Sequence, residues 1–549
     1  MVIFFLEDFM LTPYTLRFIS LAIPALTLCG CRASGTNETN LQPAAPAQDS
    51  AEQASLTANN PNIPADLQAI LQKRKDRSPI QDITQVRPLV FVVSIPTDGF
   101  KYSLYNLYAR DEREHISAAF PDFKPNFEID FDGDGIYETQ NELSFTYPKA
   151  GTYQVSVRGE LDTIIIGTIN ERILDAPPSR YEPPKADVLA LLQWGDIRWK
   201  SMDNFANNCK HMQVVAKDTP DLTDVRSLAY MFANAEEMNA DLSLWDISNV
   251  TTLEGMFQNA RSFNQPLNTW NTSKVTDISK TFDGASSFNQ PLDKWDVSNV
   301  TKMNHTFAHA SSFNQPLNAW NTSRLTELEH TFWGADHFNQ PLDHWDVSNV
   351  NSFYETFRSA ESFNQPLESW DVSNARTFSG MFDDAVSFNQ PLEKWNVSNA
   401  DSMWYMFQGA ENFNQPLEKW DVSNVDNMND MFNRAIRFNQ PLNAWNTKSL
   451  RYMNHTFERA ASFNQPLDKW DVSHVDEMYG TFDSAVSFNQ PLDAWKVSEQ
   501  AAQTANKILS GARSYTQKLP AWIPEQDFQA KDWVADEAIK KLGLNVPAK

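Results

Sequence analysis

Three carboxylates early in the chain have the spacing of a calcium-binding loop. Asp130, Asp132 and Asp134 alternate with other residues and are followed by Gly135, and alternate carboxylates can converge on one hard cation. A loop of this kind closes with a bidentate Glu, but this chain has Asn141 at that position, and no helical pattern precedes the first Asp. The sequence therefore favours a tight turn, with bound calcium as the alternative and no other cofactor expected.

A second group of side chains that could bind a metal is spaced by 25 residues. His305, His330 and Glu355 would stand on three successive coils of a structure with that period. Imidazole ladders on an open face usually lack the supporting hydrogen bonds that fix metal ligands. We therefore expect no metal at these residues, and we keep His305 and His330 as candidate ligand-binding residues.

Large aromatic side chains occupy variable positions of the same repeat. Trp333, Tyr354, Trp404 and Tyr405 are predicted to point outward and to form a patch suited to a protein partner or to sugar rings. The alternative is a set of scattered, tolerated surface aromatics. No carboxylate pair and no Ser, His or Cys constellation stands apart from the repeat pattern, so we expect no enzymatic activity.

All of these aromatic and histidine residues belong to a repeat of 25 residues. The motif Phe-Asn-Gln-Pro-Leu occurs ten times without an insertion, and the third residue after each Leu is Trp. Degraded copies at Met238–Leu242 and Tyr515–Leu519 flank the series, as expected of capping repeats. A fixed period of this size predicts a solenoid of leucine-rich-repeat type in which each coil contacts only its neighbours. The ten copies begin at Phe263, Phe288, Phe313, Phe338, Phe363, Phe388, Phe413, Phe438, Phe463 and Phe488.

Each coil is predicted to hold a short helix and a short strand. Positions 300, 303, 306, 307 and 310 have the spacing of one buried helix face, preceded by an Asx-type turn or cap at Asp296. Phe313–Leu317 is predicted to be a strand, kept brief by its Pro. Asn314 recurs in every full copy, where its amide could hydrogen-bond the backbone of the next coil and form a ladder. Phe, Leu, Met and Trp at the repeat spacing are predicted to form the core.

Composition excludes several classes of protein. With 549 residues and 41% apolar content the chain can bury a large core. Its formal net charge of -25 argues against binding nucleic acid through phosphate contacts. Three cysteines are too few for a disulfide scaffold, and Cys209 is expected to be a small core residue rather than a reactive thiol.

The N-terminal residues predict export and a lipid anchor. Leu16–Leu28 contains one Arg and an apolar run too short to span a bilayer comfortably, which is typical of a secretion signal. The run ends in Leu-Cys-Gly-Cys, which resembles the bacterial lipobox and implies that Cys31 is acylated. Two acidic residues precede Met10, so Met10 is an alternative start. The polar segment that follows, 32–86, is expected to be a disordered tether.

A β-rich segment precedes the repeats. Pro88–Pro96 and Thr152–Gly159 have the patterns of strands. The Asp-Gly-Asp-Gly sequence at Asp132–Gly135, with Tyr-x-x-x-Gly-Thr-Tyr at Tyr147–Tyr153, resembles the polycystic-kidney-disease-type (PKD) domain and implies a small all-β sandwich. The predicted organisation is signal peptide 1–31, tether 32–86, PKD-like domain 87–170, linker and lead-in 171–200, repeat solenoid 201–524, and capping helix 525–549.

The repeat unit also carries a resemblance to a family. Trp-Asp-Val-Ser-Asn-Val-Thr-x-Met, then Phe-x-x-Ala, then Phe-Asn-Gln-Pro-Leu, resembles the BspA-like leucine-rich-repeat surface proteins of bacteria over roughly residues 88–522. The resemblance implies a lipid-anchored protein exposed on the cell envelope that adheres to extracellular proteins or cells, and it brings no catalytic residues. The alternatives are a carbohydrate-binding envelope protein and a structural spacer without a saturable ligand.

Overall fold

The computed structural model describes residues 87–104, 126–137, 139–140, 142–160, 163–167, 185–197, 199–523 and 540–543. The predicted signal peptide with Cys31 and the predicted tether lie outside these residues, as does most of the predicted capping helix. No helix within the described ranges is long and apolar enough to cross a membrane.

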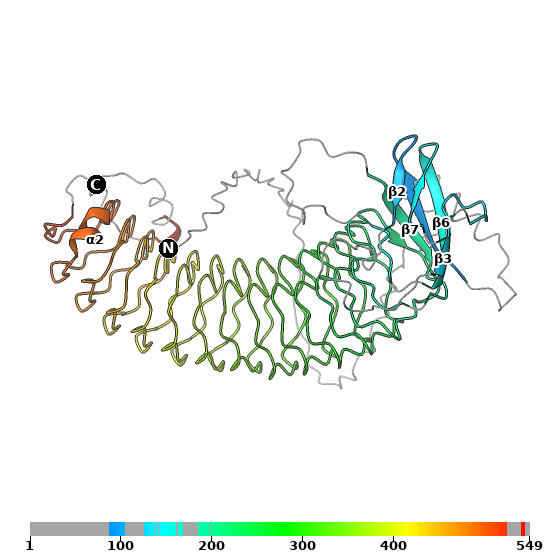
Figure 1. The fold of residues 1–549 in the computed structure, drawn as a ribbon. Coiled ribbons are helices and arrows are strands. Elements are labelled where there is room, and N and C mark those ends of the chain that lie inside the picture. The colour runs from blue at the N-terminus through cyan, green and yellow to red at the C-terminus, as the bar shows by residue number, and fades with distance from the viewer. Residues whose placement is uncertain are drawn as a thin grey trace, which may run out of the picture. The chain divides into compact units, whose positions relative to one another are not determined.

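The N-terminal strands form two sheets (Figure 1). The larger sheet has the order β4-β3-β6-β1-β7-β8. Its strands are β1 (Leu89–Ile95), β3 (Asn126–Asp130), β4 (Thr139–Gln140), β6 (Gly151–Glu160), β7 (Asp187–Gln193) and β8 (Gln213–Val214). The smaller sheet pairs β2 (Lys101–Ser103) with β5 (Ser144–Thr146). Strand β1 lies between β6 and β7 and buries apolar side chains on both faces, which explains its nearly continuous apolar sequence.

The predicted boundary between the β-rich segment and the repeats is wrong. Strand β7 lies inside 171–200, which was expected to be a linker, and pairs antiparallel with β1. Strand β8 belongs to the first repeat and pairs parallel with β7. Trp194, which follows β7, is buried against Phe205 and Trp245 at ring distances of 5.3 and 5.2 Å. The large sheet and the first repeats therefore share one hydrophobic core.

From about residue 200 onward, successive repeats lie side by side as parallel coils (Figure 1). One column of parallel β-bridges joins positions 25 residues apart. It runs from Ser227 through Thr252, Asp277 and Lys302 to Glu327, and again from Ser352 through Thr377, Ser402, Asn427 and Tyr452 to Glu477.

The predicted helix of each coil is replaced by consecutive turns. In the repeat that begins at 300, the amides of Met303 and Phe307 donate to the carbonyl oxygens of Glu327 and Thr331 in the next coil, both at 2.9 Å. The amide of His305, between them, likewise donates to Glu329 of the next coil at 2.9 Å, whereas that of Thr306 closes a turn within the coil onto Met303 at 3.1 Å. An α-helix cannot form because alternate amides are used between coils. The predicted inward positions are nevertheless buried, because turns of this spacing also return every third or fourth side chain to one face.

The predicted strand at Phe313–Leu317 is also absent, but the predicted Asn ladder is confirmed. The backbone amide of Asn314 donates to the side-chain oxygen of Asn289 at 3.0 Å, and Oδ1 of Asn314 accepts from the amide of Asn339 at the same distance. Nε2 of the neighbouring Gln donates to that Asn oxygen as well, as Gln340 does at 3.0 Å. Side-chain amides thus supply the bonds that a strand partner would have supplied.

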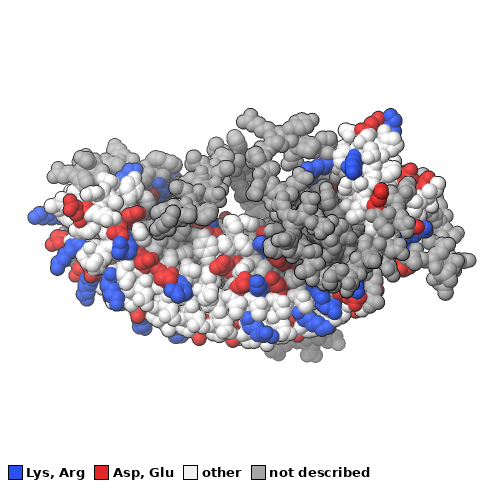
Figure 2. Space-filling model, viewed as in Figure 1, with Lys and Arg blue, Asp and Glu red and all other residues white. Residues whose placement is uncertain are grey.

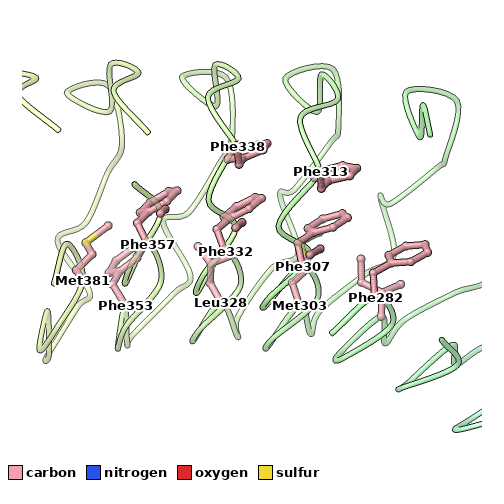
Figure 3. Close-up of a cluster of buried hydrophobic side chains, with 14 of the residues drawn as sticks. Phe282, Met303, Phe307, Phe313, Leu328, Phe332, Phe338, Phe353, Phe357 and Met381 are labelled. Atoms are coloured by element: carbon pink, nitrogen blue, oxygen red, sulfur yellow. The ribbon is translucent and has the colours of Figure 1, made fainter. Parts of the chain in front are cut away.

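Aromatic rings stack from coil to coil along the core (Figure 3). Phe307 and Phe332 have ring centroids 5.6 Å apart and nearly parallel planes. Each also stacks on the Phe of its own Phe-Asn-Gln-Pro-Leu motif, as Phe307 does on Phe313 at 4.2 Å. Trp320 closes the coil, and its Nε1 donates to the carbonyl oxygen of Leu292 at 3.0 Å. The core predicted from the repeat spacing is confirmed by burial of these columns.

The C-terminal end of the stack is closed by a degraded repeat. Helix α2 (Glu499–Thr504) begins at Ser498, whose side chain accepts from the amide of Ala501. Tyr515 and Trp522 stack on the last full repeat, as the sequence predicted, and Thr516 donates its amide to Asn489 at the end of the Asn ladder. Of the predicted capping helix, only residues 540–543 are described.

Replacing a tryptophan of the closing column should cost far more stability than replacing an exposed residue of the same coil. Trp370 is 3% exposed, and its Nε1 donates to the carbonyl oxygen of Leu342 at 2.9 Å. We expect Trp370→Ala to lower the free energy of unfolding by about 3–5 kcal/mol, because it opens a cavity in the shared core. Glu361→Ala, at an exposed position, should change it by less than about 0.5 kcal/mol. Urea unfolding would contradict the core assignment if the two variants were equally stable.

Candidate functional site

A buried carboxylate, Glu355, is the centre of the polar side chains in the middle coils. It is 4% exposed and accepts a hydrogen bond from the hydroxyl of Tyr405 at 2.6 Å. Nη1 of Arg358 lies 2.9 Å from its Oε2, and Nε2 of His330 lies 3.5 Å from the same oxygen. Burial acts to raise the pKa of Glu355, but the hydrogen bonds from these three partners outweigh it and lower the pKa to about 2. Glu355 is therefore a fixed anion.

Tyr405 reaches Glu355 across an intervening coil. The two residues are 50 positions apart, and the coil between them has Gly380 in the same column. A Cβ at Gly380 would collide with the ring of Tyr405 and lie 2.9 Å from Cγ of Glu355. Tyr405 is only 7% exposed, so the prediction that it points outward is wrong: the missing side chain at Gly380 leaves space for its ring to lie along the stack.

A second pair skips a coil in the same way. Nη2 of Arg434 lies 2.7 Å from Oδ1 of Asp384, and Gly409 stands between them. The expectation that coils contact only their neighbours is therefore wrong at these two places. Arg358 adds a link between neighbouring coils, because its Nε lies 3.1 Å from Oδ2 of Asp383 while its Nη1 binds Glu355.

The two candidate histidines stack on each other. The rings of His305 and His330 are 4.2 Å apart and within 7° of parallel. The lone pairs of imidazole nitrogens lie in the ring planes, so two parallel stacked rings cannot direct them at one metal about 2 Å from each. Glu355 is already bound by Arg358 and Tyr405. Burial, with the nearby His330 as a further cause, lowers the pKa of His305 to about 4.

Trp333 and Tyr354 are half-buried among these groups. Trp333 packs against His309 at a ring distance of 4.4 Å, and Cζ of Arg358 lies 5.5 Å from its ring centroid. The hydroxyl oxygens of Tyr354 and Tyr405 lie 2.8 Å apart. The predicted patch of outward aromatics is thus mostly an internal network.

Trp404 is the candidate aromatic that does face solvent, with 43% of its surface exposed. Its ring meets that of Tyr405 edge to face at 4.5 Å, and its indole N–H donates to the carboxylate of Asp430. Sequence analysis missed Tyr452, which is 36% exposed. The sequence could have indicated this residue, because Tyr452 is the one aromatic in a bridge column otherwise made of Ser, Thr, Asp, Lys, Glu and Asn.

The loop after β3 forms the predicted tight turn. The amides of Gly133 and Gly135 donate to the two carboxylate oxygens of Asp130 at 2.7 and 3.1 Å. Ligand oxygens of Asp130, Asp132 and Asp134 lie within 4.8 Å of one another. Burial raises the pKa of Asp130 despite these amide bonds. The turn is confirmed, and calcium binding stays an untested alternative.

Two further sequence predictions concern single residues. Cys209 is buried, and burial raises the pKa of its thiol, which confirms it as a core residue. Oδ1 of Asp296 accepts from the amide of Ser298 at 3.0 Å, which confirms the Asx-type turn. Hydrogen bonds from the side chain and the backbone amide of Ser298 lower the pKa of Asp296. The same bond recurs in other coils whether the residue is Asp or Asn, as at Asn321.

Charged side chains of both signs are interspersed over the face drawn in Figure 2. Several pair between neighbouring coils, as Lys394 does with Glu368 at 2.8 Å and Lys419 with Glu393 at 2.9 Å. The Lys side chain of each pair is exposed to solvent, so each pair contributes little to stability.

Adding one methyl group at Gly380 should disrupt the contact between Tyr405 and Glu355. Gly380 has a φ of 63°, so Gly380→Ala combines a left-handed backbone cost of about 1 kcal/mol with the collision against Tyr405, for a total of about 2–3 kcal/mol. In a Tyr405→Ala background the cost should fall to about 1 kcal/mol. Gly135→Ala, with φ of 91° and nothing within 4 Å of the added Cβ, is the control for backbone cost alone. Urea unfolding measures these losses of stability. If Gly380→Ala cost the same in both backgrounds, the ring of Tyr405 would not fill the space beside Gly380.

Stability should fall in acid partly through His305. Its pKa is about 4 in the folded protein against 6.5 in the unfolded chain. The unfolded chain therefore takes up this proton first, so the contribution of His305 is fully present above pH 6.5 and is lost as pH falls from 6.5 toward 4. We expect His305→Gln to lose less stability than the parent between pH 7 and pH 5 in urea unfolding. Parallel losses in the two proteins would contradict the assignment.

The similarity of this chain to a known protein family lies in its repeats. The model of the family described as "Mycoplasma protein of unknown function, DUF285" matches residues 200–320, 301–420 and 401–522. No curated protein and no solved structure matches the chain. The three matches overlap and run from residue 200 to 522, which is more than half of the chain. The chain is therefore a surface-type repeat protein that belongs to the DUF285 family.

Proposed function

We propose that this protein is a lipid-anchored bacterial cell-surface protein whose repeats bind an extracellular partner and so mediate adhesion. The observation that carries the proposal is the uninterrupted series of DUF285 repeats from residue 200 to 522, stacked through a column of parallel bridges in two runs and one shared core. Stacked repeats present an extended surface on which a partner can meet several coils at once. The stack supports a leucine-rich-repeat-type solenoid, and the strands that precede it, β1 to β7, support a PKD-like domain.

The site proposed for the partner is the outer surface of the middle coils. Trp404 is exposed there and is held by Tyr405, which in turn is bound to Glu355. A rigid aromatic side chain gives up little conformational entropy on binding, which suits it to be an anchor. No catalytic role is proposed, since Glu355 is ionised and its oxygens are already bound by Arg358 and Tyr405.

The specific alternative is a carbohydrate-binding envelope protein, which the exposed indole of Trp404 favours. A spacer without a ligand is the third candidate, and it predicts no saturable binding. Cells that carry the protein should adhere to host-cell surfaces in a saturable manner, and purified protein should compete. Adhesion equal to that of cells from which the gene has been deleted would leave the spacer as the better description.

The anchor is tested separately. If Cys31 is acylated, Cys31→Ala should release the protein into the soluble fraction and abolish labelling by a fatty-acid probe, because the acyl chains supply the membrane affinity. Cys29→Ala, two residues away, is the matched control and should leave both unchanged. Retention of the Cys31→Ala protein in the membrane fraction would refute the anchor.

A further inference from the structure

Two exposed aromatic side chains stand on coils that are two repeats apart. The described residues expose four large apolar side chains: Ile136, Leu244, Trp404 and Tyr452. Of these, Tyr452 stands two rungs along the bridge column from Ser402, which lies two residues before Trp404. At a spacing of about 4.8 Å per rung, two rungs cover about 10 Å along the stack.

The indole of Trp404 is held in one orientation before any ligand arrives. Tyr405 meets it edge to face at an interplanar angle of 89°, and the indole N–H donates to the carboxylate of Asp430 in the next coil. Tyr405 is fixed in its turn by its hydroxyl, which donates to Glu355 at 2.6 Å and lies 2.8 Å from the hydroxyl of Tyr354. The network of buried polar groups thus acts as a support for one exposed ring.

The surface around the two rings is polar rather than apolar. Ser402 and Asn427, in the bridge column between them, are partly exposed. Oγ of Ser402 lies 2.9 Å from Oγ of Ser379, which accepts a hydrogen bond from Thr377. A protein hot spot requires a fully desolvated pocket ringed by further contacts, and two rings separated by hydroxyl and amide groups do not provide one.

We propose that Trp404 and Tyr452 are two subsites for one glycan chain that lies along the stack. The apolar face of one pyranose ring packs on the indole and that of another ring packs on the phenol, while sugar hydroxyls hydrogen-bond to Ser402 and Asn427 between them. This inference rests on the proposed adhesive function and names its ligand class: an extended chain of pyranose rings long enough to cover two coils.

The test uses the full-length protein on an array of oligosaccharides and polysaccharides that covers α- and β-linked glucose, N-acetylglucosamine, galactose and mannose. Affinity for any glycan that binds is then measured by calorimetry. Trp404→Ala and Tyr452→Ala should each weaken binding by about ten-fold or more, which corresponds to about 1.4 kcal/mol. A disaccharide of the same linkage should bind at least about ten-fold more weakly than the hexasaccharide, because it cannot reach both rings.

Leu244→Ala is the matched control, because Leu244 is 84% exposed in an earlier coil and should leave affinity unchanged. All variants are first checked for the melting temperature of the parent. Absence of binding to every glycan, or binding that survives Trp404→Ala in a protein of unchanged stability, would overturn the proposal.

Failure here is distinguishable from failure of the adhesive function. If cells adhere to enzymatically deglycosylated surfaces as they do to intact ones, the glycan site is wrong while adhesion stands. If the protein binds glycan but cells with and without it adhere equally, the glycan site stands and the adhesive function is wrong.

Discussion

The stack depends on how each coil satisfies its backbone hydrogen bonds with the coil that follows. Alternate amides between Met303 and Phe307 donate to carbonyl oxygens 24 residues ahead, and the amide of Asn314 donates to an Asn side chain 25 residues behind. A buried amide without a partner is costly. An insertion in any one coil would shift all of these partners at once, which explains why the ten full copies keep one length.

The same hydrogen bonding fixes the left-handed positions of each coil and so determines which side chains fit there. Each coil has left-handed residues four positions apart, as at His305 and His309, and small or polar residues fill most of these columns. Where glycine occupies such a position, a side chain of the next coil can extend along the stack, past the glycine, instead of pointing away from it. Gly380 and Gly409 therefore allow ties between coils that are not adjacent, and one of these ties supports the exposed ring of Trp404.

Most of the core could be predicted from the sequence, because the columns of Phe, Leu and Trp report burial directly. The conformation between 300 and 310 could not, because the same stripe of apolar residues arises from an α-helix and from successive turns. The pattern tells which side chains are buried but does not tell which carbonyl accepts from each amide.

The strand assigned to Phe313–Leu317 is absent for a related reason, since Asn side chains replace the backbone partner. Tyr405 was placed on the wrong side because its environment depends on Gly380, one coil away, and Asp187–Gln193 was taken for a linker because its partner β1 is about 100 residues earlier.

Side-chain amides of the Asn column bond the backbone of one coil to the next. Amide hydrogen exchange measures this directly. The backbone amides of Asn339, Asn364 and Asn389, which donate to Asn side chains at 2.9 to 3.0 Å, should be protected as strongly as that of Phe332, which donates to a backbone carbonyl at 2.9 Å. Exchange of the three Asn amides at the rate of unprotected loops, while Phe332 stays protected, would contradict it.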